Sequence, residues 1–295
     1  MVSVMNSNSF MAVLRRWKFL CRLTIAAISC TVVCSMTHAE GQLLGTAGVG
    51  PLEGGSGGGI SPWATLAGYA TRDEWAATAT ISKVDVSDFT LNAASVALNY
   101  QNRIELSIGR LDIQDKSGGE IIRQNIGGLK VRVLGDLVYD KLPLLSVGLQ
   151  HKSLIDQDTA RAVGAQDTSG TDFYISAARA WLNGPGNRTI FLNVNLRNTE
   201  ANQLGLLGFG GDRGDRHWLV EGAAAIYFNR HWAIGAEYRQ KPDNLSALKE
   251  DDWNEVFIAY FPSKSLSFTG AYLELGSIAG QRNQNAWYVS MQAAF

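Results

Sequence analysis

Apolar and polar side chains alternate with a period of two residues through most of the chain after residue 40. In residues 190–197, read as IFLNVNLR, every second side chain is apolar, and the same alternation recurs at 104–108, 129–133 and 232–239. Because successive side chains of a β-strand point to opposite faces, this pattern predicts strands with one apolar and one polar side. No uninterrupted apolar run of 18 residues follows residue 39, so no transmembrane helix is expected there.

The alternating segments predict fourteen strands, at residues 42–49, 59–70, 75–84, 89–100, 104–112, 127–135, 143–152, 171–181, 189–198, 217–227, 232–240, 253–261, 265–274 and 285–295. Short turns, such as 101–103 and 229–231, alternate with long loops, at 113–126, 153–170, 199–216, 241–252 and 275–284. This alternation is typical of an up-and-down antiparallel β-barrel that spans an outer membrane. Twelve strands are the alternative, if the glycine-rich residues 42–58 form a plug.

The aromatic residues and the prolines favour the barrel. Seven of the eight tryptophans follow residue 39, and each is close to the end of a predicted strand. Amphipathic rings are favoured at the two membrane interfaces, where such strands end. A soluble secreted β-sandwich is the competing fold, but it predicts no such placement of tryptophan.

Residues 1–39 have the features of a secretory signal peptide. A basic segment that contains Arg15 and Arg16 precedes the mostly apolar residues 23–36, and small residues precede a cleavage site between Ala39 and Glu40. The cysteines Cys21, Cys30 and Cys34 all lie in this segment, so the mature chain, residues 40–295, is expected to contain no disulfide. Twin-arginine export and lipoprotein processing are weaker alternatives, because neither motif is complete.

The composition argues against nucleic-acid binding. Charged residues make up 18% of the chain, and its formal net charge is −1. With four of the 26 basic residues and none of the 27 acidic ones in the presequence, the mature chain has a net charge of −5.

The last predicted strand, 285–295, ends at an aromatic residue. Its alternating apolar residues resemble the carboxy-terminal signal that the outer-membrane assembly machinery recognises, although Ala293 departs from that pattern. The residues of this signal are Trp287, Val289, Met291 and Phe295. The assembly machinery is therefore an expected partner, together with outer-membrane lipid and lipopolysaccharide.

The alternation also predicts which side chains face the barrel lumen. The cost of a cation in lipid, about 2–4 kcal/mol at the midplane, assigns the charged face of each strand to the inside. These residues are Glu105, Lys130, Arg132, Gln150, Lys152, Asn193, Asn195, Arg197, Glu221, Glu237, Arg239, Glu255 and Gln292. Glu105 is expected to pair with Lys130 or Arg132. The set fits either a polar pore or an interior ion-pair network that closes the barrel.

No motif predicts an enzyme, a cofactor or a metal site. The glycine-rich stretch 50–59 lacks the ending of a phosphate loop, so we interpret it as a flexible or plugging segment. Ser153 and Asp156 follow His151, but no pattern joins the three into a catalytic triad. The loop 205–217 holds two arginines and two aspartates that could bind lipopolysaccharide phosphates or a cation, although a solvated loop is the simpler interpretation.

Four segments carry a resemblance to a known family. They are LLGTAGVGPLEGGSGGGISPW at 43–63, LAGYATRD at 66–73, RIELS at 103–107 and GLKVRVLGD at 128–136. Together they resemble the bacterial exported family called domain of unknown function 3034, and the similarity covers the whole mature chain. The resemblance implies an outer-membrane location in a Gram-negative bacterium and no particular activity.

The function expected from these observations is a passive, narrow, porin-like channel for small polar solutes. The alternative is a closed structural or binding barrel that contacts lipopolysaccharide or an envelope partner. A lipid-modifying enzyme is a third and weaker possibility.

Overall fold

The computed structural model describes residues 43–214 and 216–295. Residues 1–42 lie outside this part of the chain, so the signal peptide and the cleavage site between Ala39 and Glu40 stay predictions. No helix among the described residues is long and apolar enough to cross a membrane.

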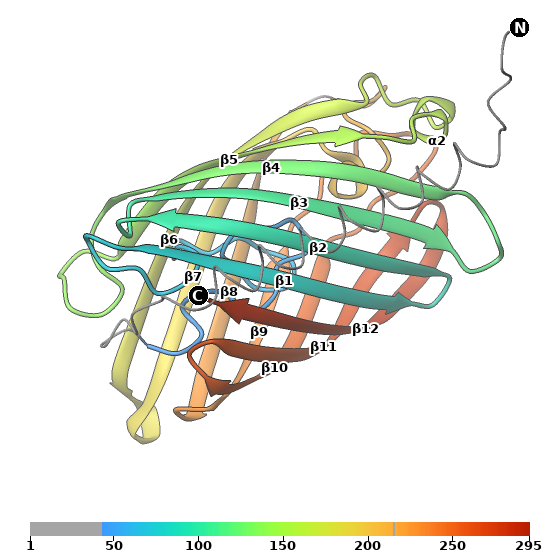
Figure 1. The fold of residues 1–295 in the computed structure, drawn as a ribbon. Helices are drawn as coiled ribbons and strands as arrows, with labels where there is room; N and C mark the ends of the chain where they lie inside the picture. Colours follow the sequence, from blue (N-terminus) through green and yellow to red (C-terminus); the bar gives the residue numbers. More distant parts are fainter. Residues whose placement is uncertain (1–42, 215) are drawn as a thin grey trace, which may run out of the picture. The chain divides into compact units, whose positions relative to one another are not determined.

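Twelve antiparallel strands in the described residues form a closed barrel (Figure 1). Each strand pairs with its neighbours in the chain, and the first strand pairs with the last, with Ile81 opposite Met291. The strands are β1 Trp75–Val86, β2 Phe89–Tyr100, β3 Ile104–Asp115, β4 Ile121–Leu134, β5 Leu144–Leu154, β6 Ser169–Gly184, β7 Arg188–Thr199, β8 His217–Asn229, β9 Trp232–Arg239, β10 Trp253–Ser263, β11 Leu266–Ile278 and β12 Gln281–Ala294. Three short helical turns lie between them: α2 Asp158–Ala162, η2 Pro185–Asn187 and η3 Asn202–Gly205.

In the described residues no strand covers 43–49 or 59–70, where two strands were expected, and this corrects the count from fourteen to twelve. The described part of this region, residues 43–70, enters the barrel lumen as an irregular segment that we call the plug, and nearly all of it is buried. Glycines with positive φ, such as Gly48 (+97°) and Gly50 (+116°), bend the backbone away from an extended course. The plug alternative was therefore right, although the plug is longer than residues 42–58.

The barrel has a turn end, where β1 begins and β12 ends, and an opposite loop end. The loop end carries the connections 155–168, 200–216 and 240–252. The long loops expected at 113–126 and 275–284 are mostly strand, because β3, β4, β11 and β12 extend towards the loop end. In the extensions of β3 and β4 the alternation of apolar and polar residues is weaker, because polar side chains such as Gln114 and Asn125 occupy outward positions.

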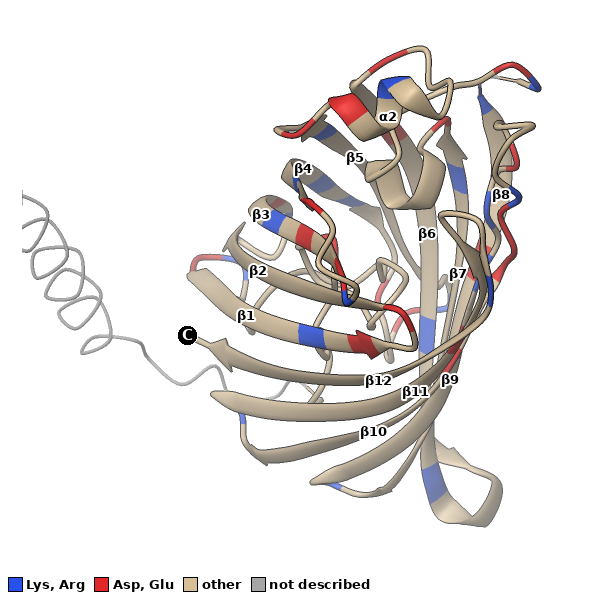
Figure 2. Ribbon diagram, turned by 90° about the vertical axis from the view of Figure 1, so that its right-hand side faces the viewer, with Lys and Arg blue, Asp and Glu red and all other residues tan. Residues whose placement is uncertain are grey.

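The outward face of the strands is apolar. Ile81, Ile108, Val194, Val256 and Val289 are each more than half exposed on the outer wall. Charged residues are scarce along β10–β12 and gather around α2 and the neighbouring loops (Figure 2). Of the tryptophans expected at an interface, Trp63 and Trp253 are instead buried inside the barrel.

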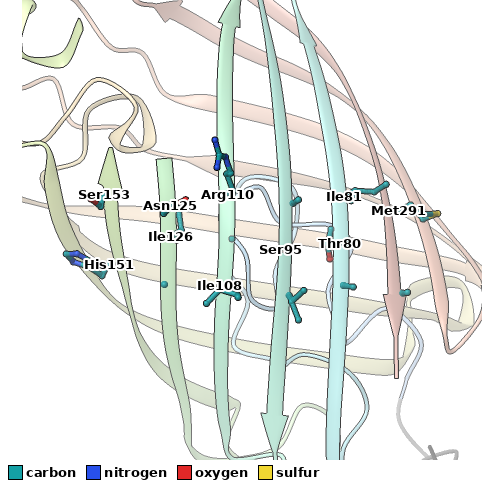
Figure 3. Close-up of a pocket in the computed structure, with 16 residues that line it drawn as sticks. Thr80, Ile81, Ser95, Ile108, Arg110, Asn125, Ile126, His151, Ser153 and Met291 are labelled. Atoms are coloured by element: carbon teal, nitrogen blue, oxygen red, sulfur yellow. The ribbon is translucent and has the colours of Figure 1, made fainter. Parts of the chain in front are cut away.

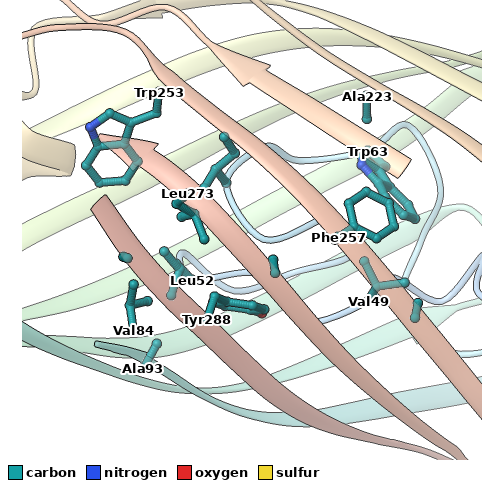
Figure 4. Close-up of a cluster of buried hydrophobic side chains, with 14 of the residues drawn as sticks. Val49, Leu52, Trp63, Val84, Ala93, Ala223, Trp253, Phe257, Leu273 and Tyr288 are labelled. Carbon is teal, nitrogen blue, oxygen red and sulfur yellow. The ribbon is translucent and has the colours of Figure 1, made fainter. Parts of the chain in front are cut away.

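The buried core lies inside the barrel, between the plug and the strands. Val49, Leu52 and Trp63 of the plug belong to one apolar cluster with wall residues such as Phe257 and Tyr288 (Figure 4). The ring of Trp63 lies 4.6 Å from that of Phe191. The inner surface of the wall is therefore covered by the chain's own residues rather than lining an open lumen.

Candidate functional site

The inward face of the barrel carries almost all of the expected lumen set. Of the thirteen residues predicted to line the lumen, Arg132 is half-buried near the turn end, and each of the other twelve is at most 4% exposed. Strand alternation explains this placement, because every second residue of a closed barrel must point inwards. The side chains do not line open space, since most of them contact the plug.

Glu53 of the plug lies at the centre of an ionic cluster. Its carboxylate forms ion pairs with Lys152 of β5 and Arg239 of β9, and lies 3.7 Å from a guanidinium nitrogen of Arg197 on β7. Two wall carboxylates complete the cluster: Asp172 lies 2.7 Å from Lys152, and Glu221 lies 2.7 Å from Arg197. Three cations thus meet three carboxylates, and one of the three carboxylates belongs to the plug.

The charges around Glu53 decide its protonation state. Burial alone would raise the pKa of this carboxyl, but the nearby Arg239, Lys152 and Arg197 outweigh burial and hold the pKa well below its ordinary value. Glu53 is therefore an anion in the folded barrel. Without it, the same site would bury three cations against only two anions.

A second anchor joins Glu105 of β3 to Lys130 of β4. Their side chains pair at 3.2 Å, which confirms the expected pairing of Glu105 with one of the two cations on β4. The Glu105 carboxylate accepts hydrogen bonds from the backbone N–H groups of Ser56 and Ala67, at 3.2 and 2.6 Å. The Lys130 ammonium donates to the carbonyl of Ser56 at 2.8 Å. The pair therefore holds two separate stretches of the plug, one at Ser56 and one at Ala67.

A third anchor uses Glu237 of β9. Its carboxylate accepts hydrogen bonds from the backbone N–H groups of Ile60 and Ser61, from the Ser61 hydroxyl and from Nε1 of Trp63, at 2.9–3.2 Å. This contact depends on a glycine, because a Cβ on Gly58 would lie 1.7 Å from the Glu237 carboxylate. The plug backbone can approach the carboxylate only where no side chain intervenes.

Amides and hydroxyls of the wall satisfy other plug backbone groups. Asn193 accepts from the N–H of Ala64 at 2.9 Å, and Ser146 donates to the carbonyl of Ala64 at 2.5 Å. Gln292 donates to the carbonyl of Gly48 at 2.9 Å, and Asn195 donates to that of Pro62 at 2.6 Å. The irregular plug backbone thus obtains from the wall the partners that a sheet would have supplied.

Glu255 of β10 differs from the other acidic residues of the lumen. It is 1% exposed, and neither carboxylate oxygen has a hydrogen-bond partner among the described residues. It lies opposite Glu237 in the β9–β10 register, and a Cβ on Gly59 would lie 2.4 Å from its carboxylate. The plug therefore donates hydrogen bonds to the Glu237 carboxylate, but it packs against the Glu255 carboxylate without donating any.

The loop end is closed by residues of two connections. Glu250 and Lys241 form a buried ion pair at 2.8 Å, and the Glu250 carboxylate accepts a hydrogen bond from the N–H of Gln203. The Lys241 ammonium lies 4.3 Å from the centre of the Trp253 ring. Burial raises the pKa of Glu250 and lowers that of Lys241, in each case against the attraction of the other.

A hollow lies at each end of the barrel. One, of about 430 Å³, is lined by Leu43 and Thr46 of the plug and by Arg132 and Asp136 near the turn end. The other, of about 300 Å³, is lined by Gln203, Leu207 and Ile278 at the loop end. Between them the plug and the loop residues fill the barrel.

The loop 205–217 shows no free cation in its described part. Arg213 pairs with Asp243 at 3.1 Å, and Arg216 pairs with Glu200 at 2.5 Å. Asp212 accepts a hydrogen bond from the N–H of Ser246, and Asp215 lies outside the described residues. The described residues contain no group of three or more His, Cys, Asp or Glu side chains placed to hold a metal ion.

Sequence reasoning missed Glu53 and Asp172 of the ionic cluster, and also Tyr288 and Ser290, whose hydroxyls donate to the plug carbonyls of Gly50 and Val49. Asp172, Tyr288 and Ser290 have inward positions on predicted strands, so alternation alone could have found them. Glu53 is the only charged residue between Gln42 and Trp63, which is a weak signal for an anchor. Its three cationic partners could not be inferred from spacing, because they come from strands far along the chain.

A family model described as "Protein of unknown function (DUF3034)" matches residues 46–292. No curated protein matches the chain. Among solved structures, the barrel is similar to the NanC porin, with a TM-score of 0.49 and 10% identity over 73% of this chain and 98% of that one. It is also similar to Omp33 of Acinetobacter baumannii, with a TM-score of 0.47 and 7% identity over 76% of this chain and 100% of that one. The KdgM porin gives a TM-score of 0.47 and 10% identity over 74% of this chain and 99% of that one. At these identities the likeness assigns no function.

Proposed function

The chain belongs to the DUF3034 family of proteins of unknown function, and we propose that it is a self-plugged outer-membrane channel for small polar solutes. The structure would then be the closed state of this channel. The proposal has two parts, the membrane placement of the barrel and the conduction that follows when the plug moves.

The outer wall supports membrane placement. Much of its surface is apolar, and the aromatic pairs Trp75 with Tyr100 and Trp232 with Tyr260 lie near the turn end. A further pair, Tyr272 with Trp287, lies about midway along β11 and β12, on the loop-end side of the first two pairs. An apolar band between aromatic girdles is the outer surface of a transmembrane barrel. The turn end then faces the periplasm and the loop end faces the exterior.

One observation carries the conduction proposal: charged and polar side chains of the wall hold the plug. The anchors Glu105–Lys130, Glu237 and the Glu53 cluster would be exposed to water if the plug left, and each is a group that water solvates well. A lumen lined with both signs of charge suits polar solutes. The hollows at the two ends mark where a solute would enter and leave.

A closed structural or binding barrel is the second candidate. The apolar contacts inside the barrel favour it, because Val49, Leu52 and Trp63 of the plug are buried against the wall. For such a barrel we expect partners at its surface, with lipopolysaccharide as the first to test. The assembly machinery stays an expected partner under either function.

A disulfide trap tests the conduction proposal. Ser146 donates to the Ala64 carbonyl, so the double variant Ala64→Cys with Ser146→Cys places two thiols across the junction of plug and wall. In planar bilayers we expect wild type to open intermittently under voltage, the oxidised double variant to stay closed, and reduction to restore opening. The single variant Ala64→Cys is the matched control, and its openings should be the same with and without reductant.

Deletion of residues 43–68 provides the second measurement. The shortened barrel, if folded by its heat-modifiable migration, should conduct continuously. If the folded deletion variant carries no current, the channel proposal is wrong and the closed barrel replaces it.

A further inference from the structure

A groove of about 790 Å³ opens on the outer wall across β1–β5 and β12 (Figure 3). Its lining is mainly apolar and includes Ile81 and Ile108, which are 56% and 71% exposed. Small residues such as Ala94 and Gly127 also line it, and a Cβ on Gly127 would meet no atom within 4 Å. The groove is thus a depression in the surface that we propose faces lipid.

Polar side chains occupy the part of the groove nearest the loop end. Ser153 of β5 lies opposite Asn125 of β4, which lies opposite Arg110 of β3, so the three form a row across the wall (Figure 3). His151 precedes Ser153 by two residues on the same face of β5. The groove therefore spans the boundary between the apolar wall and its polar margin.

One of the two ring nitrogens of His151 has a hydrogen-bond partner among the described residues. Its Nδ1 lies 3.0 Å from Oγ1 of Thr171 on β6, and Nε2 has no hydrogen-bond partner among the described residues. Asp156, the carboxylate that follows in the sequence, instead binds Arg123 at 2.7 Å. Thr171 is therefore the group that can fix the tautomer of His151 with a proton on Nδ1 and a free lone pair on Nε2.

The groove brings together the residue types that nucleophilic catalysis uses. Residues i and i+2 of a strand have Cα atoms about 6.7 Å apart with side chains on one face, so Ser153 and His151 are neighbours in the lining of the groove. The Ser153 hydroxyl has no hydrogen-bond partner among the described residues. Asn125, opposite Ser153, supplies an amide donor for a developing oxyanion.

We propose that this groove is the acyl-ester hydrolase site of the barrel, with membrane phospholipid as the substrate class. The proposal rests on the membrane placement proposed above, and it does not require the barrel to conduct. An acyl chain would lie along the apolar part of the groove, and the ester would reach the polar margin at Ser153. An amphiphile of this kind is the ligand whose two halves match the two parts of the lining.

The reaction has two steps. The Ser153 hydroxyl attacks the ester carbonyl while Nε2 of His151 accepts its proton. The carbonyl–oxygen bond to the glycerol breaks, and His151 returns the proton to the departing lysolipid alkoxide. Water then attacks the acyl-serine with His151 as base, which releases the fatty acid and regenerates the hydroxyl. Thr171 acts through His151 and is a positioning residue.

Covalent labelling tests the nucleophile. The refolded full chain in detergent micelles is treated with an alkyl fluorophosphonate, and the labelled peptide is identified by mass spectrometry. We expect a single label on Ser153, none in Ser153→Ala, and an unchanged label in Ser95→Ala, which alters a serine of β2 whose side chain faces the plug on the inner side of the wall. A label on a different serine, or none, overturns the proposal.

Hydrolysis of a fluorogenic phospholipid tests the roles of the other groups. His151→Asn should lower the rate at least ~100-fold. Thr171→Val should lower the rate and displace its pH profile, and Thr171→Ser should restore both. Hydrolysis that persists in Ser153→Ala overturns the site. Heat-modifiable migration and vesicle flotation are measured on each variant, so an unlabelled chain that folds and floats contradicts the hydrolase site alone.

Discussion

Glu53 is the one plug residue that neutralises cations from three different strands. Because its pKa is lowered in the folded barrel, the stability it contributes is complete above the pKa of a free glutamate, about 4.3. That stability is lost only as the pH falls through the lower folded-state value. The plug should therefore stay anchored at mildly acidic pH.

The prediction for Glu53 is that the wild-type barrel is mostly closed in planar bilayers, with equally rare openings at pH 7 and at pH 4.5. Glu53→Gln should open at both, because it leaves the charges of Lys152, Arg197 and Arg239 uncompensated, and breaking a buried ion pair costs about 3–5 kcal/mol. Glu120→Gln removes an exposed carboxylate and is the control. A wild-type channel whose openings become frequent as the pH falls from 7 to 4.5 would contradict the assignment of Glu53 as the anchor.

Glu237 and Glu255 face each other across β9 and β10 but should respond to substitution in opposite directions. Glu237→Met removes the acceptor of four hydrogen bonds from the plug and should lower the free energy of unfolding. Glu255→Met removes a buried carboxylate that has no hydrogen-bond partner among the described residues, and it should raise the free energy of unfolding by about 1–3 kcal/mol. The urea midpoints of the refolded barrels measure both, and equal effects of the two substitutions would contradict the asymmetry.

Each strand of the wall has one face towards the outside of the barrel and one towards its interior, and for this reason its sequence predicts which way each side chain points. On β3 the outward Leu106 and Ile108 alternate with the inward Glu105 and Ser107, so position in the chain predicts direction. All twelve strands after residue 74 follow from such alternation. The plug has no outward face, since residues such as Val49, Glu53 and Ser56 are all buried. Its short alternation of apolar and polar residues therefore predicts two strands that the structure does not contain.

The cost of an arginine on the outward face of β3 should depend on its depth in the membrane. Ile108→Arg places a cation in the middle of the apolar wall and should cost about 2–4 kcal/mol, with a smaller folded fraction in heat-modifiable migration. Gln114→Arg lies on the same face towards the loop end and should fold as wild type does. Equal folding of the two variants would show that the outer wall of β3 does not face lipid.

The last strand should depend on its terminal residue during assembly. Trp287, Val289 and Met291 face outwards on β12, and Phe295 follows the end of this strand. Deleting Phe295 should lower the amount of folded protein in the membrane fraction without lowering synthesis. Ala294→Gly is the control, and an unchanged folded band after the deletion would count against a carboxy-terminal assembly signal.

For the whole molecule, the sequence predicted the wall better than the interior. The directions of Glu105, Lys130 and Arg197 follow from local alternation, but their partners depend on where the plug enters the closed barrel. That entry brings Ser56 to Glu105, 49 residues away, and Ile60 to Glu237, 177 residues away. Contacts of such separation leave no periodic trace in a single sequence.

The plug precedes β1 in the chain and ends up enclosed by the seam between β1 and β12. Its anchors on β3, β5, β7, β9 and β12 are spread around the whole circumference. A sheet that curls around an already bound segment meets these groups one strand at a time, whereas a finished barrel would have to be threaded. We therefore expect the plug to bind its wall partners before β1 and β12 pair, so that the barrel assembles around it.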